Sequence, residues 1–319
     1  MTIEEQLTAL PDVRVQRDVP LSAVTTWRIG GPAKVLALVT TRDALVATVN
    51  CCRAMGTRFV ILGGGSNVLF PDAGYDGVVI RVMANSMAFA DVVVHADAGV
   101  VYAALATQSA KRGLSGLEFA ATIPGTVGGA VRGNAGAWGG ETKDVVTDVE
   151  VLTTSGTVVH RSNAECAFGY RESAFKHSGE IVLGATFHLH AGDPETIVAT
   201  IRRFQGTKRD HQPLDAPAAG STFKNVPVAS IDPALFERYQ MERVRKDDVV
   251  PVGYLIEQTG LKGFRIGGIR VSEKHANFLL NDGTATAEQV VQLISVIKQK
   301  VRTTFGGLQI ELEVHLVDL

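Results

Sequence analysis

Residues 59–67 read FVILGGGSN, a short apolar run that leads directly into three consecutive glycines. A helical pattern over residues 43–56, closed by Gly56, precedes this run, so a helix, a strand and a glycine loop are expected in succession. Such a loop can expose several backbone N–H groups in one concavity and hold a pyrophosphate without a charged side chain. The stretch therefore predicts a phosphate-binding loop, with a flexible turn as the alternative.

A second glycine-rich segment lies at residues 113–140. Within it, residues 122–130 read TIPGTVGGA and residues 134–137 read NAGA. Neither loop is a P-loop or a GxGxxG fingerprint, which argues against mononucleotide hydrolysis and against a standard dinucleotide fold. Two segments whose backbone can approach a ligand closely suggest one extended cofactor, although close packing between strands also explains a single Gly-Gly pair.

Composition limits the class of protein. The chain has 319 residues, of which 45% are apolar, and a formal net charge of -2. This length suffices for two or three domains, and no apolar run approaches the roughly 20 residues of a membrane helix. The acidic start of the chain lacks an export signal, so we expect a soluble cytoplasmic protein. We expect a small-molecule partner, no nucleic acid and no membrane insertion.

The cysteines and the remaining secondary structure fit a multidomain α+β enzyme. Cys51, Cys52 and Cys166 match no disulfide framework or zinc set, so we expect buried packing residues and no metal site. Helices are expected at residues 101–111, 193–206 and 252–258 and from Thr286 onward, and strands at 92–95, 149–153, 157–160, 276–280 and 308–316.

The last expected strand alternates strictly and places Glu311 and Glu313 on one polar face. A solvated face is the usual interpretation of such a pattern, and a carboxylate that meets a substrate is the other. Residues 210–219, rich in proline and alanine, read as a linker, so a domain boundary is expected there.

Six short motifs follow one another along the chain: LGGGSN at 62–67, GLEFA at 116–120, IPGTVGG at 123–129, GYRES at 169–173, GSTFKN at 220–225 and HANF at 275–278. In their order and spacing, from Thr26 to Val314, the chain resembles the UDP-N-acetylenolpyruvoylglucosamine reductase family. Between Phe175 and Asp193 the chain has no room for the extra tyrosine-bearing loop of one branch of the family, so it looks like the second branch.

The resemblance implies an α+β protein with an FAD-binding fold of the vanillyl-alcohol-oxidase-like type, followed by a C-terminal α+β substrate domain. The expected domains are residues 1–80 and 81–210 for the flavin and 211–319 for the substrate. Non-covalent FAD and the co-substrate NADPH are implied. The residues expected to bind FAD are Gly63, Gly64, Gly65, Ser66, Asn67, Thr122, Ile123, Pro124, Gly125, Thr126, Gly128, Gly129, Asn134 and Ala135.

The same resemblance implies the reaction: hydride passes from NADPH to FAD and then to the enolpyruvyl group of a UDP-sugar. Ser221 matches the family's proton donor, and Arg171 and Glu313 match residues that stabilise the enolate-like intermediate. Without the family, a serine that follows glycine would be interpreted as a turn residue. Residues expected near the sugar nucleotide or nicotinamide are Trp138, Tyr170, Asn225 and Asn277.

Two of these positions depart from the family pattern. Trp138 stands where tyrosine is common, which keeps a stacking surface and loses the phenolic hydroxyl. Residues 208–211 (KRDH) stand where the family often places basic residues for the diphosphate, with His211 where a lysine is expected, so phosphate affinity is expected to depend on pH. A solvated run of charges is the alternative.

Two other functions compete with the reductase. The first is an oxidase or dehydrogenase of the same superfamily, but the usual histidines that tether a flavin are missing from the first 94 residues and from residues 113–140. The second is a flavin sensor without turnover, which the joint presence of Ser221, Arg171 and Glu313 disfavours.

Overall fold

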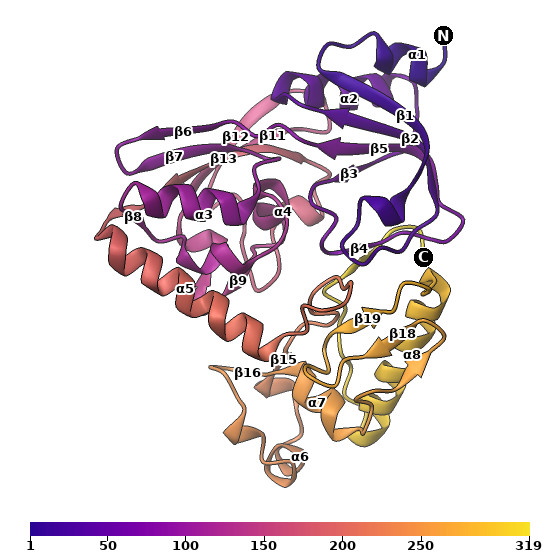
Figure 1. Ribbon diagram of the computed structural model, residues 1–319, viewed down its shortest axis with the longest axis vertical. Helices are drawn as coiled ribbons and strands as arrows, with labels where there is room; N and C mark the ends of the chain where they lie inside the picture. The colour runs from indigo at the N-terminus through magenta and orange to yellow at the C-terminus, as the bar shows by residue number, and fades with distance from the viewer. The chain divides into compact units, whose positions relative to one another are not determined.

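The computed structural model describes all residues from 1 to 319 and divides them into two compact units (Figure 1). Unit 1 consists of Met1–Val19, Ala33–Gly65 and Tyr75–Asp210, and unit 2 of Pro20–Pro32, Ser66–Gly74 and His211–Leu319. Two short N-terminal segments therefore belong to the same unit as the C-terminal third. The expected division into three domains at residues 80 and 210 stays a prediction.

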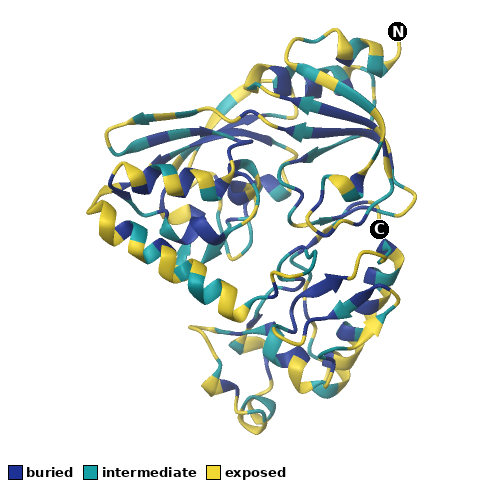
Figure 2. Cartoon of the chain, in the orientation of Figure 1, coloured by how far each residue is buried: buried dark blue, intermediate teal, exposed yellow.

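The first sheet of unit 1 has the strand order β1-β2-β5-β3. Strands β2 (Pro32–Val39), β5 (Tyr75–Val82) and β3 (Phe59–Leu62) run parallel. Most of β5 is buried, with an unbroken buried run at residues 77–80, as expected for a parallel strand covered on both faces (Figure 2). Helix α2 (Arg42–Ala54) packs against β5 and leads through a turn into β3, which ends at the first glycine loop.

The second sheet of unit 1 is antiparallel, with the order β12-β11-β13-β7-β6. Its central strands, β11 (Val146–Leu152) and β13 (Ile181–His188), are almost wholly buried, whereas the edge strand β12 (Val158–Ser162) alternates between exposed and half-buried residues. Helix α4 (Val127–Arg132) contacts β13, so the second glycine loop leads into a helix that packs on this sheet. Both sheets contribute to one hydrophobic core.

The remaining elements of unit 1 are mostly short. The helices are α1 (Ile3–Thr8), α3 (Tyr102–Lys111) and α5 (Pro194–His211), the last of which ends at the change of unit. The strands are β1 (Val13–Pro20), β6 (Met87–Ala90), β7 (Val93–Asp97), β8 (Leu114–Ser115), β9 (Gly136–Ala137), β10 (Gly140–Glu141) and β14 (His190–Ala191). The 3-10 helices are η2 (Glu118–Thr122), η3 (Thr142–Asp144) and η4 (Ala174–Lys176).

Unit 2 is built around α8 (Ala287–Thr304), whose buried apolar face packs on a small antiparallel sheet. The strands of this sheet, in order, are β17 (Arg265–Ile266), β18 (Ile269–Val271) and β19 (Leu279–Asn281). The start of α8 is capped twice: Thr286 and Gln289 form a capping box, and the Asp72 carboxylate accepts hydrogen bonds from the amides of Ala287 and Glu288 at 2.8 and 3.1 Å. The segment around Asp72 is thereby fixed to the C-terminal part of the chain.

Unit 2 contains the following further elements. The 3-10 helices are η1 (Leu21–Ala23), η5 (Val228–Ser230) and η6 (Met241–Arg243), and the α-helices are α6 (Pro233–Arg238) and α7 (Val252–Gln258). The strands are β4 (Val68–Leu69), β15 (Val226–Pro227), β16 (Val249–Val250), β17 (Arg265–Ile266), β18 (Ile269–Val271), β19 (Leu279–Asn281) and β20 (His315–Leu316). None of the helices in the chain combines the length and the apolar character needed to cross a membrane.

Most of the expected elements are confirmed, with three differences. The expected strand 276–280 is mostly wrong, because the strand β19 begins only at Leu279 and Ala276 and Asn277 lie in a turn. Helix α5 runs to His211 and takes up the start of the expected linker. The expected strand 308–316 is largely wrong, because only His315 and Leu316 form a ladder, with β4, and Leu312 forms an isolated bridge with Phe223. The segment changes partner along its length, so its alternation of burial persists without a continuous ladder.

The cysteines pack as expected. Cys52 and Cys166 are buried, Cys51 is half-buried, and all three are free thiols. Burial raises the pKa of Cys52 and of Cys166 to about 12. Their thiols are therefore almost entirely protonated, and unreactive, at neutral pH.

We expect one pair at the edge of the antiparallel sheet to make stability depend on pH. His160 of β12 lies 2.6 Å from the Asp148 carboxylate of β11, measured from Nδ1, with Glu150 and Arg42 nearby. The bond to Asp148 and its charge raise the pKa of His160. A raised folded-state pKa stabilises the fold fully below the unfolded value of about 6.5, and this stabilisation is lost as the pH rises through the folded value.

The difference in the free energy of unfolding between wild type and His160→Gln should therefore shrink as the pH is raised from about 6 to 9, measured by urea titration. Because the pair is largely exposed, the whole effect should be below about 1 kcal/mol. A difference that stays constant over this range would show that His160 does not titrate against Asp148.

Candidate active site

The two glycine loops predicted from the sequence contact each other in unit 1. A Cβ added to Gly64 would lie 2.8 Å from the Cα of Gly125, and one added to Gly63 would lie 2.5 Å from the Thr126 hydroxyl oxygen. Gly125 also has a φ of +108°, a conformation that side chains disfavour. Before any role in binding a ligand, these glycines are therefore required for the two loops to approach one another.

Two backbone amides in these loops are available to a ligand. The N–H groups of Gly64 and Gly129 make no hydrogen bond within the structure, whereas those of Val127 and Gly128 donate to the carbonyls of Val100 and Ala98 at 2.9 Å. Gly129 is exposed, and a Cβ added to it would meet only the Thr126 hydroxyl oxygen, at 3.9 Å. Free, accessible amides in adjoining loops fit the phosphates of a dinucleotide such as FAD.

Thr122, at the start of the second loop, is held from two other elements. Its hydroxyl oxygen accepts a hydrogen bond from Trp138 Nε1 at 2.9 Å, and its carbonyl accepts one from Lys208 Nζ of α5 at 2.6 Å. The Trp138 ring stacks on Phe204 of α5, with centroids 5.4 Å apart and planes 7° apart. Burial lowers the pKa of Lys208, and its charge lies beside the loop.

Asn134 is fully buried. Its side-chain NH₂ donates to Glu141 Oε2 at 3.1 Å and to the carbonyl of Gly169 at 2.8 Å, and its oxygen accepts from the Lys143 amide at 2.9 Å. The neighbouring Ala135 is held by main-chain bonds, with its amide donating to the Ala130 carbonyl at 2.8 Å. Asn134 thus fixes the backbone two residues before Arg171.

Arg171 projects from a short β-bridged turn that joins Gly169 to Glu172. Its φ is +54°, its Nη2 donates to the Gly136 carbonyl at 2.9 Å, and its guanidinium lies 5.1 Å from the centre of the Tyr170 ring. A strained backbone held in this way is common where a side chain must be aimed. Tyr170 is 39% exposed and Trp138 38%, so both rings remain accessible.

In unit 2, the chain around Ser221 is held by Asn277. The Asn277 side chain is 2% exposed, accepts from the Phe223 amide and donates to the Phe223 carbonyl, both at 2.9 Å. The Thr222 amide donates to the Asn277 carbonyl at 2.8 Å. The half-buried Ser221 itself makes no hydrogen bond in the structure, so its proton is available to a ligand.

Glu313 lies beside this segment. Its amide donates to the Thr222 carbonyl at 2.9 Å, and its carbonyl accepts from the Asn67 side chain at 3.0 Å. The main-chain pairing of residues 222–224 with 311–313 thus brings the positions of Ser221 and Glu313 close together. Glu311 instead points to solvent and forms an ion pair with Lys224 at 3.1 Å.

Asn225 has a structural contact in the same unit. Its side-chain oxygen accepts from the Val252 amide at 3.2 Å, at the first residue of α7. It therefore caps α7 at the end of the segment that carries Ser221.

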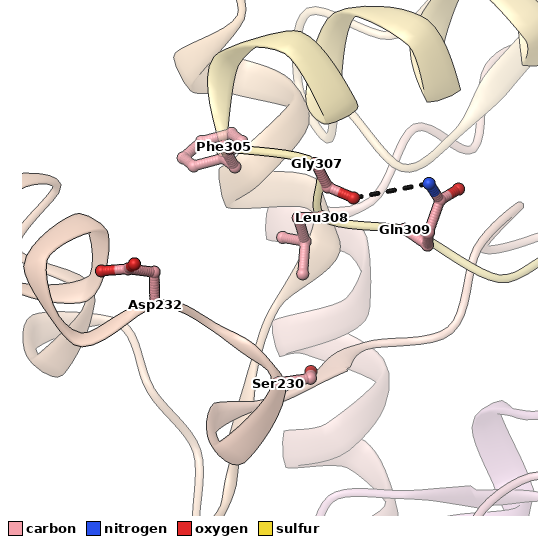
Figure 3. Close-up of a pocket in the computed structure, with 7 residues that line it drawn as sticks. Ser230, Asp232, Phe305, Gly307, Leu308 and Gln309 are labelled. Atoms are coloured by element: carbon pink, nitrogen blue, oxygen red, sulfur yellow. Dashed lines mark hydrogen bonds between the residues drawn. The ribbon is translucent and has the colours of Figure 1, made fainter.

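A separate pocket of about 360 Å³ lies in unit 2, near the end of α8 (Figure 3). It is lined by Ser230, Asp232, Phe305, Gly306, Gly307, Leu308 and Gln309. The Asp232 carboxylate caps α6, and Gln309 Nε2 donates to the Gly307 carbonyl at 3.4 Å. None of the site residues predicted from the sequence lines this pocket.

The structure thus gathers the predicted residues in two groups. Gly63, Gly64 and Gly65, the second glycine loop, Trp138, Tyr170 and Arg171 belong to unit 1, and Ser66, Asn67, Ser221, Asn225, Asn277 and Glu313 belong to unit 2. Sequence reasoning missed Phe204 and identified Lys208 only as part of a run of basic residues. A signal existed for both: they lie four residues apart in a helical pattern and so share one face.

Comparison with known proteins identifies the class of this chain. The family model described as "FAD binding domain" matches residues 33–162, and the one described as "UDP-N-acetylenolpyruvoylglucosamine reductase, C-terminal domain" matches residues 212–317. This confirms the predicted α+β class with an FAD-binding fold and a distinct C-terminal domain, and it confirms FAD as the cofactor. The chain is a flavin-dependent oxidoreductase.

Relatives give the family. Proteins named UDP-N-acetylenolpyruvoylglucosamine reductase from Lachnoclostridium phytofermentans and Carboxydothermus hydrogenoformans are 37% and 38% identical, over 95% and 98% of this chain and 93% and 97% of their own. The crystal structure of the Thermus caldophilus reductase superposes with a TM-score of 0.76 at 33% identity, covering 95% of this chain and 99% of that one. The chain belongs to the UDP-N-acetylenolpyruvoylglucosamine reductase family.

Proposed function

We propose that this chain reduces UDP-N-acetylglucosamine enolpyruvate to UDP-N-acetylmuramate, with NADPH as reductant, in peptidoglycan precursor synthesis. The observation that carries the proposal is full-length similarity to reductases of that name, on a chain that retains Ser221, Arg171 and Glu313. Full-length membership of this family favours the reductase over both the oxidase and the sensor. We place the reaction in the cytoplasm.

We propose that the two glycine loops hold the FAD pyrophosphate, with the free amides of Gly64 and Gly129 as donors. The other loop residues shape this cradle, Asn67 through its backbone alone. When bound there, FAD would supply the hydride-transfer chemistry between NADPH and the substrate. Lys208 and Trp138 hold Thr122 in place, which keeps the second loop in the conformation that exposes its amides.

We propose separate roles for the three catalytic residues. Arg171 grips the substrate carboxylate through a forked pair of hydrogen bonds. Hydride addition to the outer carbon of the enolpyruvyl group leaves negative charge next to that carboxylate, which the guanidinium stabilises. Ser221 donates its proton to the carbon that carries this charge, and Glu313 assists at the same centre.

We propose that the sugar nucleotide is bound through exposed rings and polar groups. Trp138 and Tyr170 offer accessible aromatic faces. Asn225 and Asn277 act indirectly: their side chains hydrogen-bond to main-chain groups and so hold α7 and the Ser221 segment in place. The partner is a UDP-sugar, and the proposal involves no nucleic acid.

The proposal predicts ping-pong kinetics, because the flavin must be reduced by one substrate before it can reduce the other. Purified protein should carry a flavin spectrum, and NADPH oxidation should require the enolpyruvyl substrate. Double-reciprocal plots at several NADPH concentrations should be parallel. Intersecting lines with no competition at high substrate would contradict the alternating use of one flavin by the two substrates. NADPH oxidation at an equal rate without the enolpyruvyl sugar would contradict the assignment of that sugar as the substrate.

A further inference from the structure

Asn67, the last residue of the first glycine loop, contacts the segment that carries Glu313 at two points. Its side-chain Nδ2 donates to the Glu313 carbonyl at 3.0 Å, and its own carbonyl accepts from the His315 amide at 3.0 Å. The pairing then continues as the parallel ladder of β4 with β20, where His315 is opposite Val68. The side-chain bond is therefore an addition to a pairing that the backbone already makes.

This addition gives the backbone of Glu313 a second restraint beside the one from Thr222. The Glu313 amide is held by the Thr222 carbonyl, next to Ser221, and the Glu313 carbonyl is held by Asn67. When both peptide groups of a residue are held, its backbone dihedrals are restricted, and so is the direction in which its side chain leaves the chain. Residues 311–314 have no continuous ladder of their own to supply this restraint.

We propose that Asn67 is a positioning residue for Glu313, acting through the side-chain amide rather than through a contact with the cofactor. The inference rests on the proposed function for its effect on catalysis. Asn67 follows Gly65 by two residues, so the loop assigned to the FAD pyrophosphate ends in the residue that aims the catalytic glutamate. Catalytic rates are sensitive to small displacements of such a side chain, since a displacement of about 1 Å can lower the rate on the order of a hundredfold.

Three substitutions isolate the side-chain bond. Asn67→Ala removes the donor and Asn67→Asp replaces it with an acceptor, while Asn67→Gln keeps an amide donor on a longer arm. All three retain the main-chain bond from His315, so the β4·β20 pairing should survive. The matched control is Asn163→Ala in unit 1, which removes another side-chain amide that donates to main-chain carbonyls, those of Lys143 and Val146.

The holoenzyme variants are compared by three measurements: flavin content, the two half-reactions by stopped flow, and hydrogen exchange of peptides that cover residues 311–317. We expect Asn67→Ala and Asn67→Asp to retain FAD and reduction by NADPH. Reoxidation by the enolpyruvyl substrate should slow about 10- to 100-fold in limiting rate, without a matching change in half-saturating substrate. Exchange around residue 313 should increase, and Asn67→Gln should recover part of the rate.

Asn67→Ala combined with Glu313→Gln should be no slower than Glu313→Gln alone, because the amide acts only through the glutamate. The inference is overturned if Asn67→Ala loses FAD, slows both half-reactions equally, matches Asn163→Ala in reoxidation, or leaves exchange around residue 313 unchanged. Failure of the wild-type enzyme to be reoxidised by the enolpyruvyl substrate would instead overturn the proposed function. In that case the exchange measurement still decides whether Asn67 holds Glu313.

Discussion

Replacing Ser221 by alanine is expected to slow reoxidation of the enzyme by the enolpyruvyl substrate by about a hundredfold to ten-thousandfold, the usual contribution of general acid catalysis. Reduction by NADPH should be nearly unchanged, because that half-reaction protonates no carbon. The structure supports this separation, since the Ser221 hydroxyl makes no hydrogen bond and its loss leaves no buried partner unsatisfied. Stopped-flow absorbance of the flavin measures each half-reaction separately.

Two further variants sharpen this prediction. Ser221→Cys should recover part of the rate, because a thiol can also donate a proton. Ser230→Ala removes another serine hydroxyl of unit 2, one that donates to the Pro227 carbonyl, and should change neither half-reaction. If Ser221→Ala is reoxidised within a few-fold of wild type, or loses both half-reactions equally, the serine is a turn or binding residue and the proton has another source.

The local pattern of the sequence predicts those parts of the fold that depend on neighbouring residues. The helix, strand and glycine loop around residues 59–67 follow from apolar periodicity and glycine, and the structure has α2, β3 and the loop in that order. Thr286 and Gln289, three positions apart in the sequence, likewise match a capping box at the start of α8, and the capping box forms.

Long-range partners could not be predicted in this way. The Asn67 side chain reaches Glu313 across 246 positions, and Lys208 reaches Thr122 across 86. A periodic pattern indicates which face of an element is buried but not which distant segment meets it. The sequence therefore placed Asn67 in the cofactor loop without revealing its bond to the glutamate segment.

The final segment shows the same limit in its secondary structure. Strict alternation over residues 308–316 predicts a strand, and Ile310 and Val314 are indeed buried. Strand assignment also requires a continuous partner, and here Leu312 pairs with Phe223 while Leu316 pairs with Leu69. Alternation predicted the burial correctly and the hydrogen bonding wrongly.

The second large effect is expected at the glycine loops, where packing against the protein and packing against the cofactor can be separated. Gly64→Val should abolish FAD binding and also lower the melting temperature of the apoprotein, because its side chain would collide with the backbone of Gly125, 2.8 Å from the added Cβ. Gly129→Val should lower FAD occupancy about as strongly while leaving the apoprotein's melting temperature nearly unchanged, because a Cβ there meets no atom closer than 3.9 Å beyond its chain neighbours and the backbone of its own helix.

Gly206→Ala in α5 serves as the matched control in the same unit, because an added Cβ there meets nothing within 4 Å, and it should keep both FAD and stability. Flavin absorbance per protein gives the occupancy, and thermal unfolding of the apoproteins gives the stability. If Gly129→Val keeps full FAD occupancy, the exposed amide of Gly129 does not bind the phosphates, and the two loops only pack against each other. Occupancy lost without any loss of apoprotein stability in Gly64→Val would mean that the loops come together only around the cofactor, so that FAD itself completes this part of unit 1.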